Sequence, residues 1–267
     1  MTIVGACGLI AGSAMAQSYP TARPYPGVNT PTVRAPAEAP RRTSVPAPAP
    51  AATSTQPAWR GPATPRYGFT GAAAQAANWE IGPIIRGRSR SPGMPLRPTQ
   101  LGGGADGAWS FDFPGPRASD GHVHYVTMPT RSLAGADRIT MTYRIDAAPG
   151  TRFVPQEQPD TPATMSLYFQ VAGDNWTARD QYRFARWYAP REKVVPVTPG
   201  THTVSIGLDE NWTAVVAFKR DTAPQEFERA KADAARIGFV FGGGGGRGHG
   251  VFATEPARFT LLDFRVE

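Results

Sequence analysis

Apolar and polar residues alternate with a period of two along much of the chain after residue 79. From Ile139 to Ile145 every second residue is apolar, and threonine or arginine stands between. The segment 164–172 repeats this pattern, with Met165, Leu167 and Phe169 on one side. Such alternation predicts β-strands that place one face in a core and leave the other more polar.

About ten segments are expected to form strands, and the spacing of 8 to 15 residues between them is typical of a β-sandwich. They are residues 79–85, 108–113, 122–128, 138–145, 164–172, 181–188, 201–208, 213–218, 237–241 and 259–266. The last two are the most hydrophobic and are expected to lie inside sheets. A single helix is predicted over 225–235, which is rich in helix formers and follows Pro224. The fold class is therefore all-β, a jelly-roll type β-sandwich with one short helix.

The first 75 residues differ in composition from the rest. Residues 17–75 are rich in proline and alanine, a composition that does not form a core, so a disordered linker is expected before a β-sandwich domain over 76–267. Residues 1–16 resemble a signal peptide, with Ala14-Met15-Ala16 as the cleavage site. No lysine or arginine precedes Arg23, so either the true start lies upstream or Met1 is not the start. We expect a periplasmic or secreted protein.

Two features near the N-terminus bear on anchoring. Cys7 is the only cysteine, and Val4-Gly5-Ala6-Cys7 resembles a lipoprotein box. A lipid anchor at Cys7 is the less favoured alternative, because only three residues precede the box. No apolar stretch reaches the roughly 18 residues of a membrane span, so none is expected.

The net charge of +7 does not indicate nucleic-acid binding. Of the 28 basic and 21 acidic residues, six arginines and one glutamate precede residue 79, so the tail carries about +5 and the remainder about +2. No nucleic-acid-binding motif is found, and no nucleic-acid partner is expected.

Residues 76–267 resemble galactose-binding-like jelly rolls, the fold of many carbohydrate-binding modules, with the best match over residues 201–267. The likeness rests on the strand 201–208, Asn211-Trp212, the helix containing Phe227, the strand 237–242 and the closing strand 259–266. The resemblance implies carbohydrate binding. The calcium-ligand cluster that many such modules carry is not evident in this sequence, which leaves a structural ion in doubt.

Aromatic and polar residues suited to a sugar are predicted on the strand faces opposite the core. Sugar rings present apolar C–H faces and hydroxyl groups, which flat aromatic rings and amide or guanidinium groups complement. The candidate ligand-binding residues are Tyr168, Gln170, Asn175, Trp176, Arg183 and Trp187. The alternative is that these residues form a second core layer under loops.

Arg86, Arg88 and Arg90 alternate directly after the first strand segment, so an extended chain would align them on one side, and Arg86 and Arg88 complete the candidate site. They could bind the carboxylates or sulfates of an acidic glycan. A solvated basic edge that protects a strand from aggregation explains them equally well.

Other motifs give weaker indications. His122 and His124 share a strand face as a metal pair would, but no further ligands are evident, and no metal is predicted. The glycine-rich loop 242–250 lacks the lysine and following helix of a phosphate loop, so it is interpreted as a turn that brings Arg247 and His249 towards a neighbouring surface. No catalytic motif is found, and no cofactor is expected.

The sequence therefore predicts a non-catalytic carbohydrate-binding protein of the cell envelope or extracellular space, with a polysaccharide or glycan as partner, an acidic one included. Two alternatives stay open: a structural or protein-interaction sandwich, and a polysaccharide-active hydrolase or lyase.

Overall fold

The computed structural model describes residues 73–101, 108–244 and 247–267. The predicted signal peptide with Cys7, and the predicted linker up to residue 72, lie outside the described residues.

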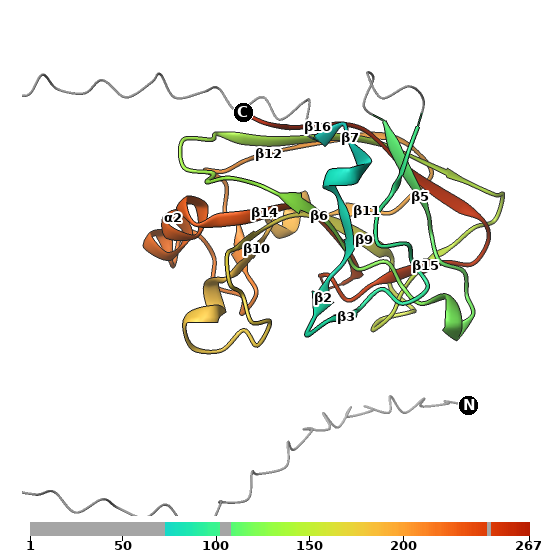
Figure 1. Cartoon of the computed structure of the whole chain (residues 1–267), viewed down its shortest axis with the longest axis horizontal. Helices are drawn as coiled ribbons and strands as arrows, with labels where there is room; N and C mark the ends of the chain where they lie inside the picture. Colours follow the sequence, from blue (N-terminus) through green and yellow to red (C-terminus); the bar gives the residue numbers. More distant parts are fainter. Residues whose placement is uncertain (1–72, 102–107, 245–246) are drawn as a thin grey trace, which may run out of the picture. The chain divides into compact units, whose positions relative to one another are not determined.

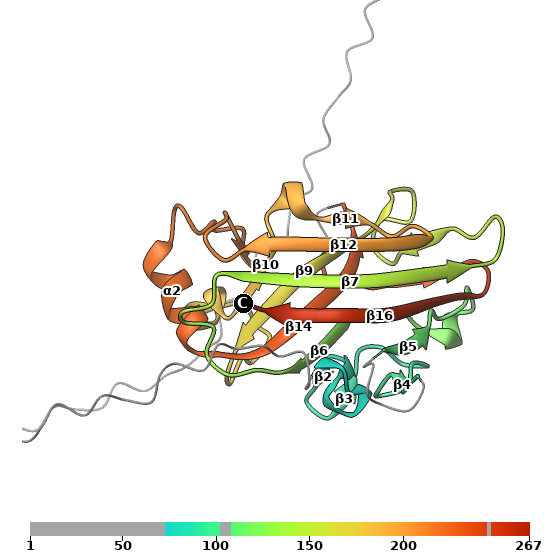
Figure 2. The same ribbon diagram turned by 90° about the horizontal axis from the view of Figure 1, so that it is seen from above.

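Two antiparallel sheets pack face to face, which confirms the predicted all-β sandwich (Figure 1). The seven-stranded sheet has the order β1 (Glu80–Gly82), β6 (Tyr125–Pro129), β14 (Ala234–Gly243), β9 (Ala163–Val171), β10 (Arg186–Tyr188) and β13 (Thr213–Ala214), and β11 (Val195–Pro196) also pairs with β9. The five-stranded sheet has the order β12 (Gly200–Gly207), β7 (Arg138–Ala147), β16 (Ala257–Val266), β5 (Trp109–Asp112) and β4 (Thr99–Gln100). Figure 2 shows β12, β7 and β16 running side by side across the other layer.

Smaller elements close the ends of the sandwich. Two further antiparallel pairs are β15 (Val251–Ala253) with β8 (Phe153–Pro155), and β2 (Ile84–Ile85) with β3 (Arg88–Ser89). The one α-helix among the described residues, α2 (Pro224–Ala232), begins at a proline and buries Phe227 and Ala230. Proline suits the first helical turn because its missing N–H would be unpaired there in any case. Short 3-10 helices are η1 (Ala76–Asn78), η2 (Ala118–Asp120), η3 (Asp180–Phe184) and η4 (Arg191–Lys193).

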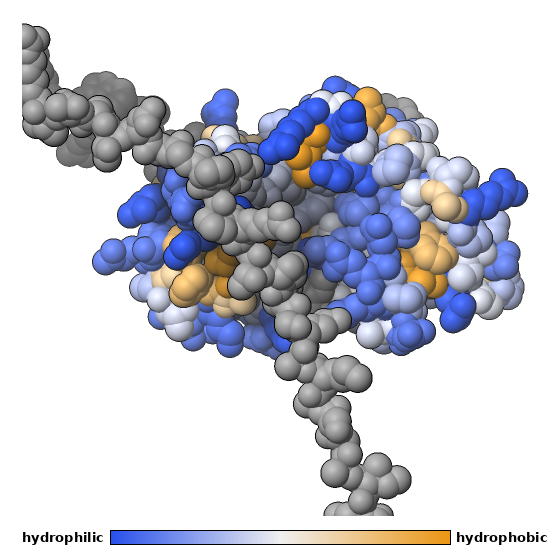
Figure 3. All heavy atoms as spheres, turned by 90° about the horizontal axis from the view of Figure 1, so that it is seen from below, coloured by the Kyte–Doolittle hydropathy of each residue, from blue (hydrophilic) through white to orange (hydrophobic). Residues whose placement is uncertain are grey.

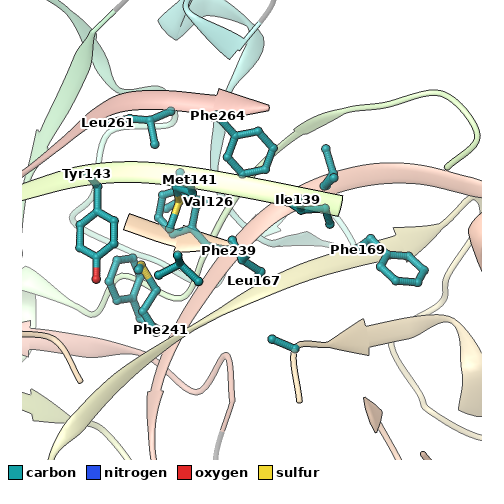
Figure 4. Close-up of a cluster of buried hydrophobic side chains, with 14 of the residues drawn as sticks. Val126, Ile139, Met141, Tyr143, Leu167, Phe169, Phe239, Phe241, Leu261 and Phe264 are labelled. Carbon is teal, nitrogen blue, oxygen red and sulfur yellow. The ribbon is translucent and has the colours of Figure 1, made fainter. Parts of the chain in front are cut away.

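The core lies between the two sheets and is dominated by aromatic rings. Figure 4 shows side chains of β7 and β16 meeting those of β9 and β14 from the opposite sheet. Phe259 of β16 stacks on Tyr143 of β7 and Phe111 of β5, with ring centroids 5.3 and 5.1 Å away. Complete burial of one such side chain contributes about 1.5–3 kcal/mol, so these rings dominate the stability of the sandwich.

Strand β16 pairs with β7 on one side and β5 on the other, so the closing strand is internal to its sheet as predicted. One expectation within it is wrong. A register shift between Leu261 and Asp263 turns Leu262 outward, and 36% of Leu262 is exposed. A β-bulge adds one residue to a strand and so breaks the strict alternation of faces that the sequence implied.

Candidate functional site

A groove crosses the seven-stranded sheet on the face that points away from the core. It encloses about 1280 Å³ and is lined by residues from β6, β10 and β13, the β2–β3 hairpin, the loop before η3 and the glycine-rich loop. The hairpin and the η3 segment project from the same side of this sheet (Figure 1). Seen from that side, the surface is mainly hydrophilic, with separate apolar patches (Figure 3). We call this feature the tyrosine groove, after the three tyrosines beneath it.

The floor of the tyrosine groove is a small apolar layer separate from the main core. Tyr125 of β6, Tyr168 of β9, Tyr188 of β10 and Val240 of β14 are all buried and pack together. The ring of Tyr168 lies 5.1 Å from that of Tyr125 and 5.2 Å from that of Tyr188. The register explains this arrangement, because Tyr168 stands directly opposite Tyr188 on the neighbouring strand.

The three phenol groups keep their protons at neutral pH. Burial raises the pKa of each tyrosine above its ordinary value. The hydroxyls of Tyr125 and Tyr188 share a hydrogen bond of 2.9 Å, whereas the buried hydroxyl of Tyr168 has no hydrogen-bond partner among the described residues. The floor therefore holds neutral phenols and provides no tyrosinate base.

A buried ion pair organises one wall of the groove. The carboxylate of Asp174 lies 3.0 Å from the Nε of Arg186, and the two side chains are 0% and 8% exposed. The Nε–H of Arg186 forms no hydrogen bond with this carboxylate, so the contact is an ion pair without one. Asp174 instead accepts a hydrogen bond from the Nε2 of Gln170 at 2.9 Å and another from the backbone N–H of Trp176 at 2.9 Å. The pair thus ties the loop after β9 to the surface of the sheet.

Trp176 is held over this ion pair. The guanidinium carbon of Arg186 lies 4.8 Å from the centre of the indole, and the ring of Tyr125 meets Trp176 at 5.3 Å and nearly a right angle. Trp176 adopts a positive φ of 67°, which costs free energy for a residue with a side chain. The ionic and hydrogen-bonding contacts of Asp174 fix that conformation, so the indole is positioned before any ligand arrives.

The glycine-rich loop supplies the opposite wall. Gly248, at a φ of 77°, lies so close to the hydroxyl end of Tyr125 that a Cβ there would collide with it. This close approach places the guanidinium carbon of Arg247 5.8 Å from the centre of the Tyr188 ring. His249 forms an ion pair of 2.5 Å with Glu157. The predicted approach of Arg247 and His249 to a neighbouring surface is present in the structure.

His122 and His124 directly precede β6 and line the tyrosine groove. Burial lowers the pKa of His124 to about 4, and the neighbouring His122, His249 and Arg90 add to the effect, while a hydrogen bond to the carbonyl of Gly248 opposes it. Burial also lowers the pKa of His122. Both rings are therefore neutral at pH 7, with their centroids 6.2 Å apart. Among the described residues, no group of three or more His, Cys, Asp or Glu is placed to hold a metal ion.

The predicted site residues fall into four places. Tyr168, Gln170 and Trp176 come together at the tyrosine groove, Tyr168 in its buried floor. Arg86, Arg88 and Asn175 line a smaller cleft with Arg90 and Trp176, which we call the arginine cleft. Trp176 and Arg90 line both hollows, so the two are adjacent.

Two predicted residues lie elsewhere, and the expected groove shared by Trp176 and Trp187 is wrong. Trp187 is 0% exposed and packs in the main core against Phe227, at a ring distance of 4.9 Å. Arg183 belongs to η3 and lines a different hollow beside α2. The segment 181–188 was expected to be one strand, but only its last three residues are β10, so Arg183 and Trp187 do not share a strand face.

The sequence interpretation missed Tyr125, Asp174, Arg186, Tyr188 and Arg247 as site residues. Strand pairing explains why Tyr188 belongs to the groove. Tyr188 stands opposite Tyr168, whereas Trp187 stands opposite the core residue Phe169. In the sequence, only the alternation of faces along β10 could have shown that Tyr188 and Trp187 point in opposite directions. Using it required the correct start of β10.

Comparisons with known proteins find only remote structural likenesses. No family model and no curated protein matches the chain. A carbohydrate-binding module specific for non-crystalline cellulose, CBM28, aligns with a TM-score of 0.36 and 14% identity over 78% of this chain and 95% of the module. A structure from work on endo-acting O-glycanases of human gut bacteria that initiate mucin breakdown aligns with a TM-score of 0.36 and 9% identity over 72% of this chain and 92% of the other. Neither likeness is close enough to assign a family or a ligand.

Membrane insertion through a helix has no support in the described residues, since none of their helices has the length and hydropathy to cross a bilayer.

Proposed function

We propose that this protein binds carbohydrate in the tyrosine groove without acting on it chemically, outside the cytoplasm. The observation that carries the proposal is the partly exposed, pre-positioned indole of Trp176, which lies beside the polar groups of the groove. Apolar C–H faces of sugars pack on aromatic surfaces, and sugar hydroxyls pair with phenol, amide and guanidinium groups. The periplasmic or secreted location rests on the signal-like residues 1–16 and stays a proposal.

The form of the site favours a polymer over a single sugar. The tyrosine groove is elongated across several strands, from the β2–β3 hairpin to the segment after β13, and the arginine cleft continues it beyond Trp176. Its contacts are spread along this length and do not converge on one closed pocket. A chain of sugars can use such a surface, since many modest contacts add up along it.

The absence of a recognised reaction centre leaves the enzyme alternative to experiment. Two carboxylates at the groove are Asp174, which is held by Arg186, Gln170 and Trp176, and Glu157, which is paired with His249. A glycosidase of the common type needs two carboxylates that flank one bond, one of them with a raised pKa. Release of shortened or unsaturated products from any tested polysaccharide would replace the binding proposal with a glycan-active enzyme.

The proposal is tested with Trp176→Ala. Retention of the protein by a panel of polysaccharides is measured by affinity electrophoresis, and we expect the variant to lose at least about tenfold in affinity for the retained polymer. Tyr182→Ala is the matched control, because Tyr182 is a partly exposed aromatic residue of η3 that does not line the groove. Equal binding by both variants, or no retention on any polysaccharide, would contradict the proposal.

A further inference from the structure

The charges of the tyrosine groove are strongly unbalanced. The basic residues Arg90, Arg191, Lys219 and Arg247 line it, and none of them forms an ion pair with a described residue. Its fourth arginine is Arg186, whose charge Asp174 neutralises. The one acidic residue in the lining, Glu157, is already paired with His249. The groove therefore presents uncompensated positive charge, although the described domain as a whole is nearly neutral.

Arg247 shows this imbalance most clearly. Its guanidinium is half-buried over the ring of Tyr188, at 5.8 Å, and has no carboxylate within ion-pair distance among the described residues. Burial lowers the pKa of Arg247, and the nearby cation of Arg191 lowers it further, while Tyr188 and Glu192 act in the opposite sense. A desolvated cation beside a like charge is unfavourable unless an anion joins it, so the pair is arranged for an external negative group.

Positive charge also lies beyond the tryptophan. The arginine cleft, which adjoins the groove at Trp176, holds Arg86, Arg88 and Arg90. These three arginines likewise form no ion pair with a described residue. The aromatic centre of the groove is thus flanked by two cationic regions. A polymer that carries an acid group at regular intervals can contact both regions at once, whereas a single anion can contact only one.

We infer that the tyrosine groove is selective for an anionic polysaccharide of the uronate type, with one carboxylate held by Arg247 and Arg191 and others along Arg86, Arg88 and Arg90. The inference rests on the proposed function and specifies its ligand. Arginine suits this role because its planar guanidinium donates two parallel hydrogen bonds to a carboxylate.

Nucleic acid is the other polyanion that a basic groove could attract. Single-stranded nucleic acid is held mainly by bases that stack on open aromatic faces. Here the rings of Tyr125, Tyr168 and Tyr188 are buried and pack against one another, and Arg186 already occupies one face of Trp176. The groove therefore favours a ligand whose rings are flanked by hydroxyl and carboxylate groups over one that needs several free stacking faces.

The test compares polygalacturonate with a neutral polysaccharide retained in the panel above, using the full chain. We expect Arg247→Gln and Arg191→Gln each to weaken polygalacturonate binding about tenfold at an ionic strength near 0.05 M, and the double variant to weaken it more. Arg183→Gln is the matched control, because it removes the same charge from an exposed residue outside the groove, and its affinity should stay within about twofold of the unmodified chain. Thermal unfolding of each variant shows that it is folded, and loss of Arg247 should not lower the melting temperature, since no carboxylate partner is removed.

The outcomes separate the two proposals. If Trp176→Ala abolishes binding while the Arg191 and Arg247 variants behave like Arg183→Gln, the anionic selectivity is wrong and carbohydrate binding stands. If no polysaccharide is retained, the proposed function fails and the inference fails with it. Tighter binding of single-stranded DNA than of polygalacturonate, lost in the same arginine variants, would overturn the inference in favour of nucleic acid.

Discussion

The two faces of the seven-stranded sheet use aromatic residues in different ways. On the core face, Trp187 of β10 and Phe169 of β9 are fully buried among other apolar side chains. On the groove face, their sequence neighbours Tyr188 and Tyr168 form a thin layer that carries hydroxyls and lies beside the Arg186–Asp174 ion pair. The core face contributes mainly apolar burial, whereas the groove face keeps polar groups in fixed positions at the cost of desolvating them. The proposed ligand binding therefore lies on the second face, and most of the stability comes from the first.

The largest expected effect is on the core face. Trp187→Ala should lower the free energy of unfolding by about 3–5 kcal/mol, because it leaves a cavity beside Phe227 that the surrounding rings cannot fill. Chemical denaturation measures the loss, and Trp176→Ala on the groove face is the comparison, with a smaller loss since its indole is partly exposed. Equal losses of unfolding free energy in the two variants would show that the core face does not contribute more to stability than the groove face.

The next effect concerns the ion pair of the groove face. Asp174→Asn should destabilise the protein by about 1.5–3 kcal/mol, because the buried guanidinium of Arg186 loses its counter-charge. Asp146→Asn is the control, since the pair of Asp146 with Arg144 is exposed on the five-stranded sheet and should be worth less than about 1 kcal/mol. Denaturation curves that coincide for the two variants would show that the ion pair does not organise the groove.

The smallest of these effects on stability depends on pH. The pKa of His124 is about 4 in the folded protein and near its ordinary value of 6.5 when unfolded, so the unfolded chain binds more protons between these values. His124 should therefore contribute a loss of stability as the pH falls from 6.5 to 4, on the order of 1–2 kcal/mol after allowance for its partial exposure. His124→Asn keeps a donor for the Gly248 carbonyl and should flatten this part of the pH profile. His202→Asn, on the five-stranded sheet, should leave the profile unchanged; a profile that both variants alter equally would exclude His124 as its source.

Much of the fold could be predicted from local pattern. Strands β7, β9, β14 and β16 have strict or near-strict alternation, and each was expected within a few residues of its observed bounds. The helix was also expected, because Pro224 and the helix formers after it act locally. Strand β8 was not predicted, since a short irregular strand leaves little periodic signal.

The candidate site was only partly predictable. Tyr168, Gln170 and Trp176 were recognised because they follow the reliable alternation of β9 or the loop directly after it. Trp187 was assigned to the wrong face because the sequence did not show where η3 ends and β10 begins, and a shift of one residue exchanges the two faces of a strand.

The sequence by itself determined which residues alternate, and with them the all-β class, the apolar sets of the long strands and the basic and aromatic residues available for a site. Only the tertiary structure decided which of these residues meet. Arg247, Tyr188, Tyr125 and Trp176 come from four separate segments, and their contacts depend on strand register and on loops that cross the sheet. The physical reason is the sequence distance over which the two effects act. Alternation reflects the burial of each residue within one strand, whereas a groove arises from packing between segments that are distant in the chain, and local preferences do not encode that packing.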